Sequence, residues 1–260
     1  QAWYEDSTAA GAANSAWKGL NLPAEGSTGV QAGVAEVLRA AYPEDQIAIL
    51  KVSQGATGVS YWANAGSPGY EALTSRITAV KDRLLAQQAA GEIAGFSFVG
   101  FFWMQGENEI DPWNTSGSRL YFETFHKIPT AVRAFTGVPA LPMILGRTSN
   151  AYAPSTIRVA NGDYRAFPAA VGTRPFAADS EFINSGVMRG QALFEAYSDF
   201  VRTSQIGWTL YDSHSAWVDV DDLPLVDYYH FPTGDPGKIT LGRRMGRAAL
   251  RLNGVSAADE

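Results

Sequence analysis

The sequence predicts an α/β fold with three layers (α/β/α), in which helices cover both faces of a mostly parallel sheet. Short, nearly continuous apolar runs alternate along the chain with stretches in which apolar residues recur at helical spacing. Continuous apolar runs are typical of strands buried on both faces, as in a parallel sheet. The 260 residues, 46% of them hydrophobic, are enough for one such core. We therefore expect residues 1–260 to form a single domain.

Helices and strands are expected in alternation. The first helix ends before Pro43, because proline lacks the backbone N–H that a helix requires. The second ends near Gly91, since glycine readily adopts the left-handed conformation that commonly follows a helix. Long loops rich in small and polar residues are expected at 5–26 and 148–161. In order, we expect a helix at 30–41, a strand at 46–52, a helix at 73–91, a strand at 96–104, a helix at 118–135, a strand at 141–145, a helix at 187–201, a strand at 206–211 and a helix at 238–252.

Charge and composition argue against several classes of function. The chain has 26 acidic and 20 basic residues, and its net charge of -6 repels phosphate backbones and anionic lipids. We therefore expect neither a nucleic-acid nor a membrane partner. Without cysteine there can be no disulfide, thiolate nucleophile or cysteine-ligated metal. Acidity and the lack of cysteine favour a secreted or periplasmic location.

Ligands of open α/β sheets bind beyond the carboxyl ends of the strands, so the residues that follow each apolar run are the first candidates for a site. Positions 53–58, Ser-Gln-Gly-Ala-Thr-Gly, follow the first expected strand. A turn of small residues lets backbone N–H groups approach an anion or oxyanion. A plain glycine turn without a ligand is the alternative.

Polar side chains follow the second expected strand directly. In positions 103–109, Trp-Met-Gln-Gly-Glu-Asn-Glu, an amide and two carboxylates come straight after an apolar run. Leaving Gln105 or Glu107 buried without partners would cost roughly 1–3 kcal/mol per group. A functional role is therefore favoured over a hydrogen-bonded cap of the next loop.

The third candidate segment is Asp-Tyr-Tyr-His at positions 227–230. A carboxylate three residues before a histidine can orient the imidazole and stabilise its charged form, as the acid behind a catalytic base does. A surface turn with an incidental pair of Asp227 and His230 is the alternative. His126 is expected on a helix, and His214 in a turn or at a substrate.

Taken together and in this order, the three segments resemble the SGNH (GDSL-like) hydrolases, in the branch of carbohydrate esterase family 6 and the sialate O-acetylesterase-like proteins. Positions 51–57 with Trp62 are similar to the block in which a glycine, here Gly55, supplies an N–H of the oxyanion hole. Positions 103–107 match the family's Trp-x-Gln-Gly-Glu block. Positions 227–230 resemble the last block, which carries the catalytic histidine and acid.

The resemblance implies that the mostly parallel sheet is flavodoxin-like. It also implies an enzyme that removes acetyl groups from sugar hydroxyls through a serine acyl-enzyme, without a cofactor. His230 would be the base, Asp227 would hold its ring, and Glu107 would be an alternative or additional acid. The oxyanion would be bound by the N–H of Gly55 and the side-chain amide of Gln105. An acetylated carbohydrate would be the partner.

Aromatic side chains near these segments, Trp62 among them, suit the apolar faces of sugars, and core packing explains them equally well. No metal site is expected. The acidic residues Asp219, Asp221 and Asp222 lack the glycine and the terminal glutamate of a calcium loop, which favours a solvated loop.

One family element is absent from the printed sequence. These enzymes carry the nucleophile in a Gly-Gln-Ser-Asn segment after a central first strand, and no such segment precedes Gly55. We expect that strand and its serine upstream of Gln1, between the strands at 46–52 and 96–104 in the sheet. Ser7, Ser53 and Ser149 are weaker substitutes. A catalytically inactive carbohydrate-binding relic, or a module of a larger assembly, is the alternative function.

Overall fold

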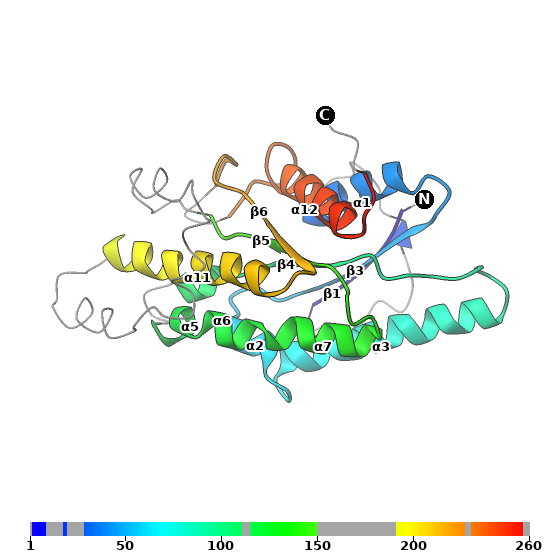
Figure 1. The fold of residues 1–260 in the computed structure, drawn as a ribbon, viewed down its shortest axis with the longest axis horizontal. Helices are drawn as coiled ribbons and strands as arrows, with labels where there is room; N and C mark the ends of the chain where they lie inside the picture. Colours follow the sequence, from blue (N-terminus) through cyan, green and yellow to red (C-terminus); the bar gives the residue numbers. More distant parts are fainter. Residues whose placement is uncertain are drawn as a thin grey trace.

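A three-layer α/β/α arrangement is found in the computed structural model, which describes residues 2–8, 18–19, 29–110, 115–149, 191–226 and 230–256. Helices α1 and α12 lie on one side of the strands, and α2, α3, α6 and α7 on the other (Figure 1). This confirms the expected fold class. The described helices are α1 (Val30–Ala41), α2 (Val59–Ala63), α3 (Pro68–Ala89), α4 (Glu107–Ile110), α5 (Thr115–Arg119), α6 (Tyr121–Phe125), α7 (Lys127–Thr136), α11 (Gln191–Tyr211) and α12 (Lys238–Leu252).

The described strands form two separate three-stranded sheets. One has the order β2-β1-β3 and the other the order β4-β5-β6. All pairs are parallel except the antiparallel pair of β1 and β2. The strands are β1 (Ala2–Thr8), β2 (Lys18–Gly19), β3 (Ile47–Ser53), β4 (Phe101–Met104), β5 (Met143–Gly146) and β6 (Ser215–Val218).

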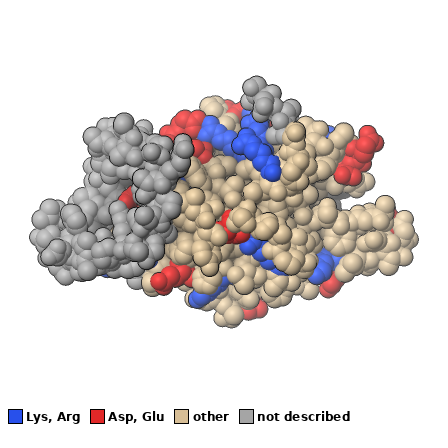
Figure 2. Space-filling model, viewed as in Figure 1, with Lys and Arg blue, Asp and Glu red and all other residues tan. Residues whose placement is uncertain are grey.

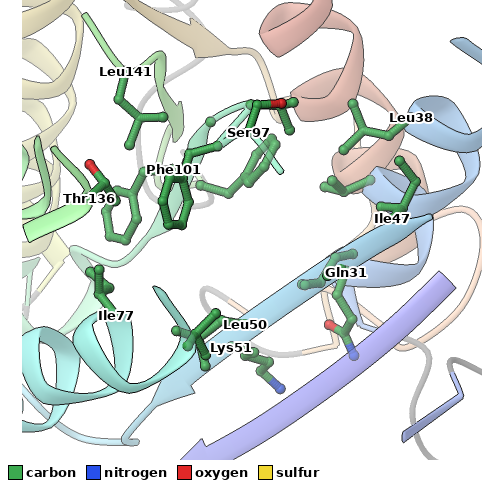
Figure 3. A pocket seen from close by; sticks show the side chains of 18 of the residues that line it. Gln31, Leu38, Ile47, Leu50, Lys51, Ile77, Ser97, Phe101, Thr136 and Leu141 are labelled. Atoms are coloured by element: carbon green, nitrogen blue, oxygen red, sulfur yellow. The ribbon is translucent and has the colours of Figure 1, made fainter. Parts of the chain in front are cut away.

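Strands β3 and β4 are the facing edges of the two sheets. They run in the same direction, since the side chain of Gln105, just after β4, donates a hydrogen bond to the carbonyl of Thr57, just after β3. Residues of both strands line one cavity (Figure 3). The carboxyl ends of the strands therefore meet although no ladder joins them.

The helices α1 and α12 pack unusually closely. A Cβ on Gly33 would lie 2.0 Å from the carbonyl oxygen of Ile239, and one on Gly242 would lie 2.0 Å from that of Val30. Since real Cβ atoms do not approach backbone oxygens so closely, only glycine permits this crossing. The crossing joins α1, in the first half of the chain, to α12, the last described helix. One of the two hydrophobic cores of the described residues lies around it. The other core lies against α2, α3, α6 and α7.

Most of the expected elements are confirmed within a few residues. Helix α12 has the bounds expected for it, and α1 lies at 30–41 as expected. Strand β3 begins and ends one residue later than expected, and β5 lies within two residues of the strand expected at 141–145. Periodicity works for α1 and α12 because each buries one stripe, and the apolar run works for β5 because all four of its residues are buried.

The strand expected at 206–211 is wrong. These residues continue α11 to Tyr211, and the strand that follows is β6. In α11 the side chains of Val201, Gln205 and Trp208 are all buried, at the spacing of four and three residues that places them on one face of a helix. A short apolar run does not separate a strand from a buried helix segment, and length decides for the helix here.

Three further expectations need correction. The helix at 118–135 is divided into α5, α6 and α7, and Pro129 lies in the first turn of α7, where a missing N–H is tolerated. The strand at 96–104 is shortened to β4, because only residues 101–104 pair with β5. The loop at 5–26 contains strand residues, since β1 pairs with β3 along seven residues. The loop at 148–161 and the start of the helix at 187–201 lie outside the described residues.

The surface in Figure 2 shows acidic and basic side chains interspersed on the viewed face, without one large patch of either sign. None of the described helices has the length and apolar character that crossing a membrane would require.

Gly242→Ala should destabilise the protein. In an exposed helix the same change would stabilise by up to about 1 kcal/mol, but here the new methyl group meets the backbone of α1. Overpacking of this kind costs roughly 1–3 kcal/mol. Urea unfolding followed by circular dichroism measures it, with Gly95→Ala as the control because a Cβ there has its nearest contact at 3.9 Å. Equal effects of the two changes would contradict the close crossing.

Candidate active site

Two of the three segments singled out in the sequence lie together at the carboxyl ends of β3 and β4. The turn after β3 is joined to the residues after β4 by hydrogen bonds. His230, the described residue of the third segment, lies close enough to Glu107 for its charge to lower the pKa of that carboxyl. Asp227, the expected acid behind His230, lies outside the described residues. This is the edge at which parallel α/β sheets bind their ligands.

The side chain of Gln105 holds the two strand ends together. Its Nε2 donates to the carbonyl of Thr57 at 3.1 Å and to Oε2 of Glu109 at 2.6 Å, while its Oε1 accepts from the hydroxyl of Tyr121 at 3.2 Å. Both amide hydrogens are therefore in use. The expected role of Gln105 in binding an oxyanion requires that its bond to Thr57 be exchanged for one to the ligand.

Glu109 is a site residue to which the sequence analysis gave no role, although it is one of the two carboxylates in positions 103–109. Its side chain is 1% exposed and accepts hydrogen bonds from the backbone N–H of Val59 and from Gln105. Burial raises the pKa of Glu109, and these hydrogen bonds oppose the rise. Its spacing of four residues from Gln105, equal to one helical turn, was the available signal.

The backbone requires a glycine at position 106, between the amide of Gln105 and the carboxylate of Glu107. Its φ is +143°, a conformation that L side chains rarely adopt, and a Cβ there would lie 2.6 Å from Cγ2 of Thr148 and 2.7 Å from Cγ1 of Val201. The backbone therefore passes against β5 and α11 at this point. Along this path the chain enters α4, whose first residue, Glu107, lies next to Gln105.

Glu107 and His230 interact electrostatically. Burial raises the pKa of Glu107, whereas hydrogen bonds from its own backbone N–H and the charge of His230 lower it. His230 is exposed, and its carbonyl accepts the N–H of Val226 at 2.9 Å. An exposed imidazole beside a half-buried carboxylate is suited to moving protons between a ligand and water.

In the turn after β3, Gly55 faces solvent, while the residues around it are fixed by hydrogen bonds. The Thr57 hydroxyl donates to the carbonyl of Gln54 at 2.9 Å and accepts from Nε1 of Trp62 at 3.0 Å. Gly55 is exposed, and a Cβ on it would meet nothing within 4 Å. Within the described part of the chain nothing accepts a hydrogen bond from its N–H. That N–H is thus available to a ligand.

Trp62 is 5% exposed and packs edge-on against Trp103, with ring centroids 6.2 Å apart. Its place in the core and its bond to Thr57 give it a structural contact with the turn. A contact with substrate stays a prediction for this residue.

A second network, also missed in the sequence, joins the ends of β4 and β5. Gln205 of α11 is fully buried; its Nε2 donates to the carbonyl of Gln105 at 2.9 Å, and its Oε1 accepts the N–H of Thr148 at 3.0 Å. The single hydrogen of the Tyr121 hydroxyl is shared between the same Gln105 carbonyl, at 3.0 Å, and Oε1 of Gln105, at 3.2 Å. Burial is the main cause that raises the pKa of Tyr121, which keeps the phenol neutral as a donor.

The acidic residues after β6 bind arginines. Arg147, fully buried, donates to Asp219 and Asp221 at 2.5 and 2.7 Å, and its guanidinium lies 4.6 Å from the centre of the Trp217 ring. The surface pair of Asp222 and Arg244 is bidentate, at 2.6 Å for both contacts. In the described segments no group of three or more metal-type ligands occurs.

The substitute serines and the remaining histidines lie as follows. Ser53 ends β3, and Ser7 lies within β1 opposite Val52. Ser149 is 5% exposed at the end of β5, and its hydroxyl has no partner among the described residues. His126 is exposed between α6 and α7. His214 precedes β6 and so lies at the amino end of that strand, opposite the candidate site.

The fold is a three-layer α/β/α arrangement of the SGNH-like type. Residues 12–170 match the family described as carbohydrate esterase, sialic acid-specific acetylesterase, and since this is more than half of the chain, the protein belongs to that family. Among the curated proteins no match was found.

Two solved structures share the fold. A protein from Arabidopsis thaliana is 20% identical, with a TM-score of 0.52 over 84% of this chain and 66% of its own. A carbohydrate acetylesterase from Xanthomonas citri is 17% identical, with a TM-score of 0.53 over 96% of this chain and 48% of its own. The chain thus spans less than two thirds of the length of either structure.

Glu109→Gln should destabilise the protein by roughly 1–3 kcal/mol, the cost of a buried unsatisfied polar group. The carboxylate accepts from two donors, Val59 N and Gln105 Nε2, whereas a glutamine has only one accepting oxygen and turns its own N–H groups toward the other donor. Urea unfolding at pH 7 measures the change, with Glu123→Gln on the exposed face of α6 as the control. A loss of stability no larger than that of the control would contradict the role of Glu109 in accepting both hydrogen bonds.

Glu107→Gln should gain stability relative to the unchanged protein as the pH rises. Burial raises the pKa of Glu107 in the folded state above its ordinary value of 4.5. Its contribution to stability is therefore complete below about pH 4.5 and is lost as the pH rises through the folded pKa. The melting temperature of both proteins from pH 4 to 8 measures this. If the melting temperature of Glu107→Gln instead falls relative to that of the unchanged protein as the pH rises, the raised pKa of Glu107 is contradicted.

Proposed function

We propose that this site hydrolyses acetyl esters of sugar hydroxyls through a serine acyl-enzyme. The observation that carries the proposal is the convergence at the carboxyl ends of β3 and β4 of the N–H of Gly55, which has no acceptor among the described residues, the amide of Gln105, and the interacting pair of Glu107 and His230. Membership of the carbohydrate esterase family supports the substrate class, and so does the acetylesterase named among the similar structures.

His230 is the general base in this proposal. It takes the proton of the serine hydroxyl as that oxygen attacks the ester carbonyl, then gives it to the departing sugar oxygen. In the second step it takes a proton from the water that attacks the acyl carbon and gives it to the serine oxygen as acetate leaves. Glu107 is the carboxylate that stabilises the charged imidazole, since each charge favours the other. Asp227 is the alternative in this role.

The tetrahedral oxyanion is bound by the N–H of Gly55. The turn that carries this N–H is fixed by Thr57, Trp62 and Gln105, so it is ordered before substrate arrives. Preorganised donors of this kind contribute about 2.7–4 kcal/mol each to the transition state. Gln105 is the second donor if its bond to Thr57 is exchanged.

The nucleophile is a serine carried by a strand that precedes residue 1 and lies between β3 and β4. The bond between Gln105 and Thr57, which follow β4 and β3, supports this because it brings the two strand ends to one place. Ser53 and Ser149 are the substitutes that the chain itself offers at this edge, and labelling distinguishes them.

The test measures release of acetate from an acetylated sugar and of p-nitrophenol from p-nitrophenyl acetate. Residues 1–260 are assayed alone and with a synthetic peptide of seven apolar residues followed by Gly-Gln-Ser-Asn. We expect hydrolysis above that of either component, and a loss of about 10²–10⁴-fold on His230→Ala, the range for a general base. His126→Ala, an exposed histidine away from the site, is the matched control.

A serine-directed phosphonate followed by mass spectrometry locates the nucleophile. The label should lie on the peptide, and a peptide with alanine in place of serine should give neither label nor hydrolysis. A label on Ser149 or Ser53 of an active chain would retain the esterase and overturn the upstream serine. Binding of acetylated sugar without any acetate release in either arm would overturn the esterase in favour of a carbohydrate-binding relic.

A further inference from the structure

The ladder between β4 and β5 stops directly before the candidate site. The two strands pair in parallel register to their last residues, and the N–H of Phe101 donates to the carbonyl of Pro142 at 2.8 Å. In a parallel pair, every second residue of a strand turns both its N–H and its C=O toward the same neighbour. Continued in this register, the next rung of the ladder would be a bond from the N–H of Thr148 to the carbonyl of Gln105.

The side chain of Gln205 occupies the place of this rung. Its Nε2 donates to the carbonyl of Gln105 at 2.9 Å, and its Oε1 accepts the N–H of Thr148 at 3.0 Å. A side-chain amide offers the same donor and acceptor as a peptide group. Two hydrogen bonds with an amide between them therefore replace one, and they hold the two strand ends farther apart than a ladder bond would.

Gly106 lies in the space that this separation provides. A Cβ at this position would lie 2.6 Å from Cγ2 of Thr148, 2.7 Å from Cγ1 of Val201 and 3.2 Å from Nε2 of Gln205. The backbone of Gly106 thus lies against the bridging amide itself. With a φ of +143° at Gly106 the chain turns from β4 into α4, whose first residue is Glu107.

Loss of the bridge would leave two unfavourable arrangements. If the strand ends stayed apart, the N–H of Thr148 would have no acceptor among the described residues, at a cost of roughly 1–3 kcal/mol. If they closed to form the missing rung, Gly106 would be displaced. The hydroxyl of Tyr121 does not replace the bridge, because its one hydrogen is shared between the carbonyl and Oε1 of Gln105.

We propose that Gln205 is a positioning residue of the candidate active site. Its amide replaces one rung of the β4–β5 ladder and so sets where Gln105 and Glu107 stand relative to a ligand. Because Gln205 holds the backbone carbonyl of Gln105, the side chain of Gln105 can exchange its bond to Thr57 for one to an oxyanion while the backbone stays in place. The identity of that ligand rests on the proposed function, whereas the positioning does not.

Hydrogen exchange tests the positioning without reference to catalysis. Gln205→Met removes the donor and the acceptor and leaves a flexible side chain of similar length. We expect the amides of 106–110 to exchange about tenfold faster, relative to those of α12, than in the unchanged protein. The control is Thr74→Val, which removes a buried hydroxyl that donates to the carbonyl of Tyr70 in its own helix, α3.

The titration of Glu107 is a readout that loss of stability alone does not move. Burial is the largest cause that raises the pKa of Glu107. In Gln205→Met the segment is no longer held against β5 and α11, so we expect the pKa of Glu107 to move down toward its ordinary value of 4.5. NMR of the carboxyl carbon measures it, and Thr74→Val should leave it unchanged.

Gln205→Glu offers a rescue that depends on pH. A protonated carboxyl can donate to the carbonyl of Gln105 and accept from Thr148, whereas an ionised one has no donor. Of the groups nearby, Tyr121 has a raised pKa and Arg202 is paired with an aspartate at 2.7 Å. The bridge thus raises the folded pKa of the new carboxyl. Protection of 106–110 should be nearly normal at about pH 4 and be lost as the pH rises, and Gln205→Met should show no recovery.

Hydrolysis separates positioning from binding. In the acetate-release assay we expect Gln205→Met to lower kcat by up to about 100-fold with little change in KM, since it misplaces reacting groups and removes no contact with substrate. An unchanged kcat would overturn the inference.

The outcomes distinguish this inference from the proposed function. Faster exchange of 106–110 together with a lowered pKa of Glu107 supports the positioning role even if the unchanged protein hydrolyses no ester, in which case the proposed function alone fails. Exchange in Gln205→Met no faster than in Thr74→Val overturns the positioning role even if esters are hydrolysed.

Discussion

The hydrogen bond from Gln105 to the carbonyl of Thr57 joins two strand ends that share no ladder. Around it, Glu109 holds the other amide hydrogen of Gln105 and the N–H of Val59, and Gln205 and Tyr121 hold the carbonyl of Gln105. One amide side chain thus fixes the positions of the turn after β3, the start of α4 and the end of β4. The geometry of the candidate site depends on this clamp.

The sequence was most informative where a residue type has one physical use. Pro43 and the apolar stripe before it predicted α1, and Lys238–Leu252 was predicted in full because its apolar face is regular. The end of α11 was mistaken for a strand, since residues 206–211 are apolar over too short a stretch for periodicity to decide. β6 was missed because its four residues have a mixed pattern in which only the two ends are buried.

The candidate site could be predicted in part, because its residues follow strands directly. Gly55, Gln105 and Glu107 are visible in the sequence by position alone, and the structure brings their segments together. Gln205 could not be found in this way. It reaches Gln105 from a helix one hundred residues further along the chain, and nothing in a helical stripe marks one glutamine as a buried bridge. The same holds for Arg147, whose acidic partners come seventy-two and seventy-four residues later.

The close crossing of α1 and α12 has a consequence for synthesis of the protein. The two glycines that permit it, Gly33 and Gly242, are separated by most of the chain. While a ribosome is still making the residues between them, the apolar stripe of α1 has no helix to cover it. Contacts between residues so far apart in the sequence form late, and they make folding slower. The nascent first half therefore exposes apolar surface of the kind through which partly folded chains aggregate.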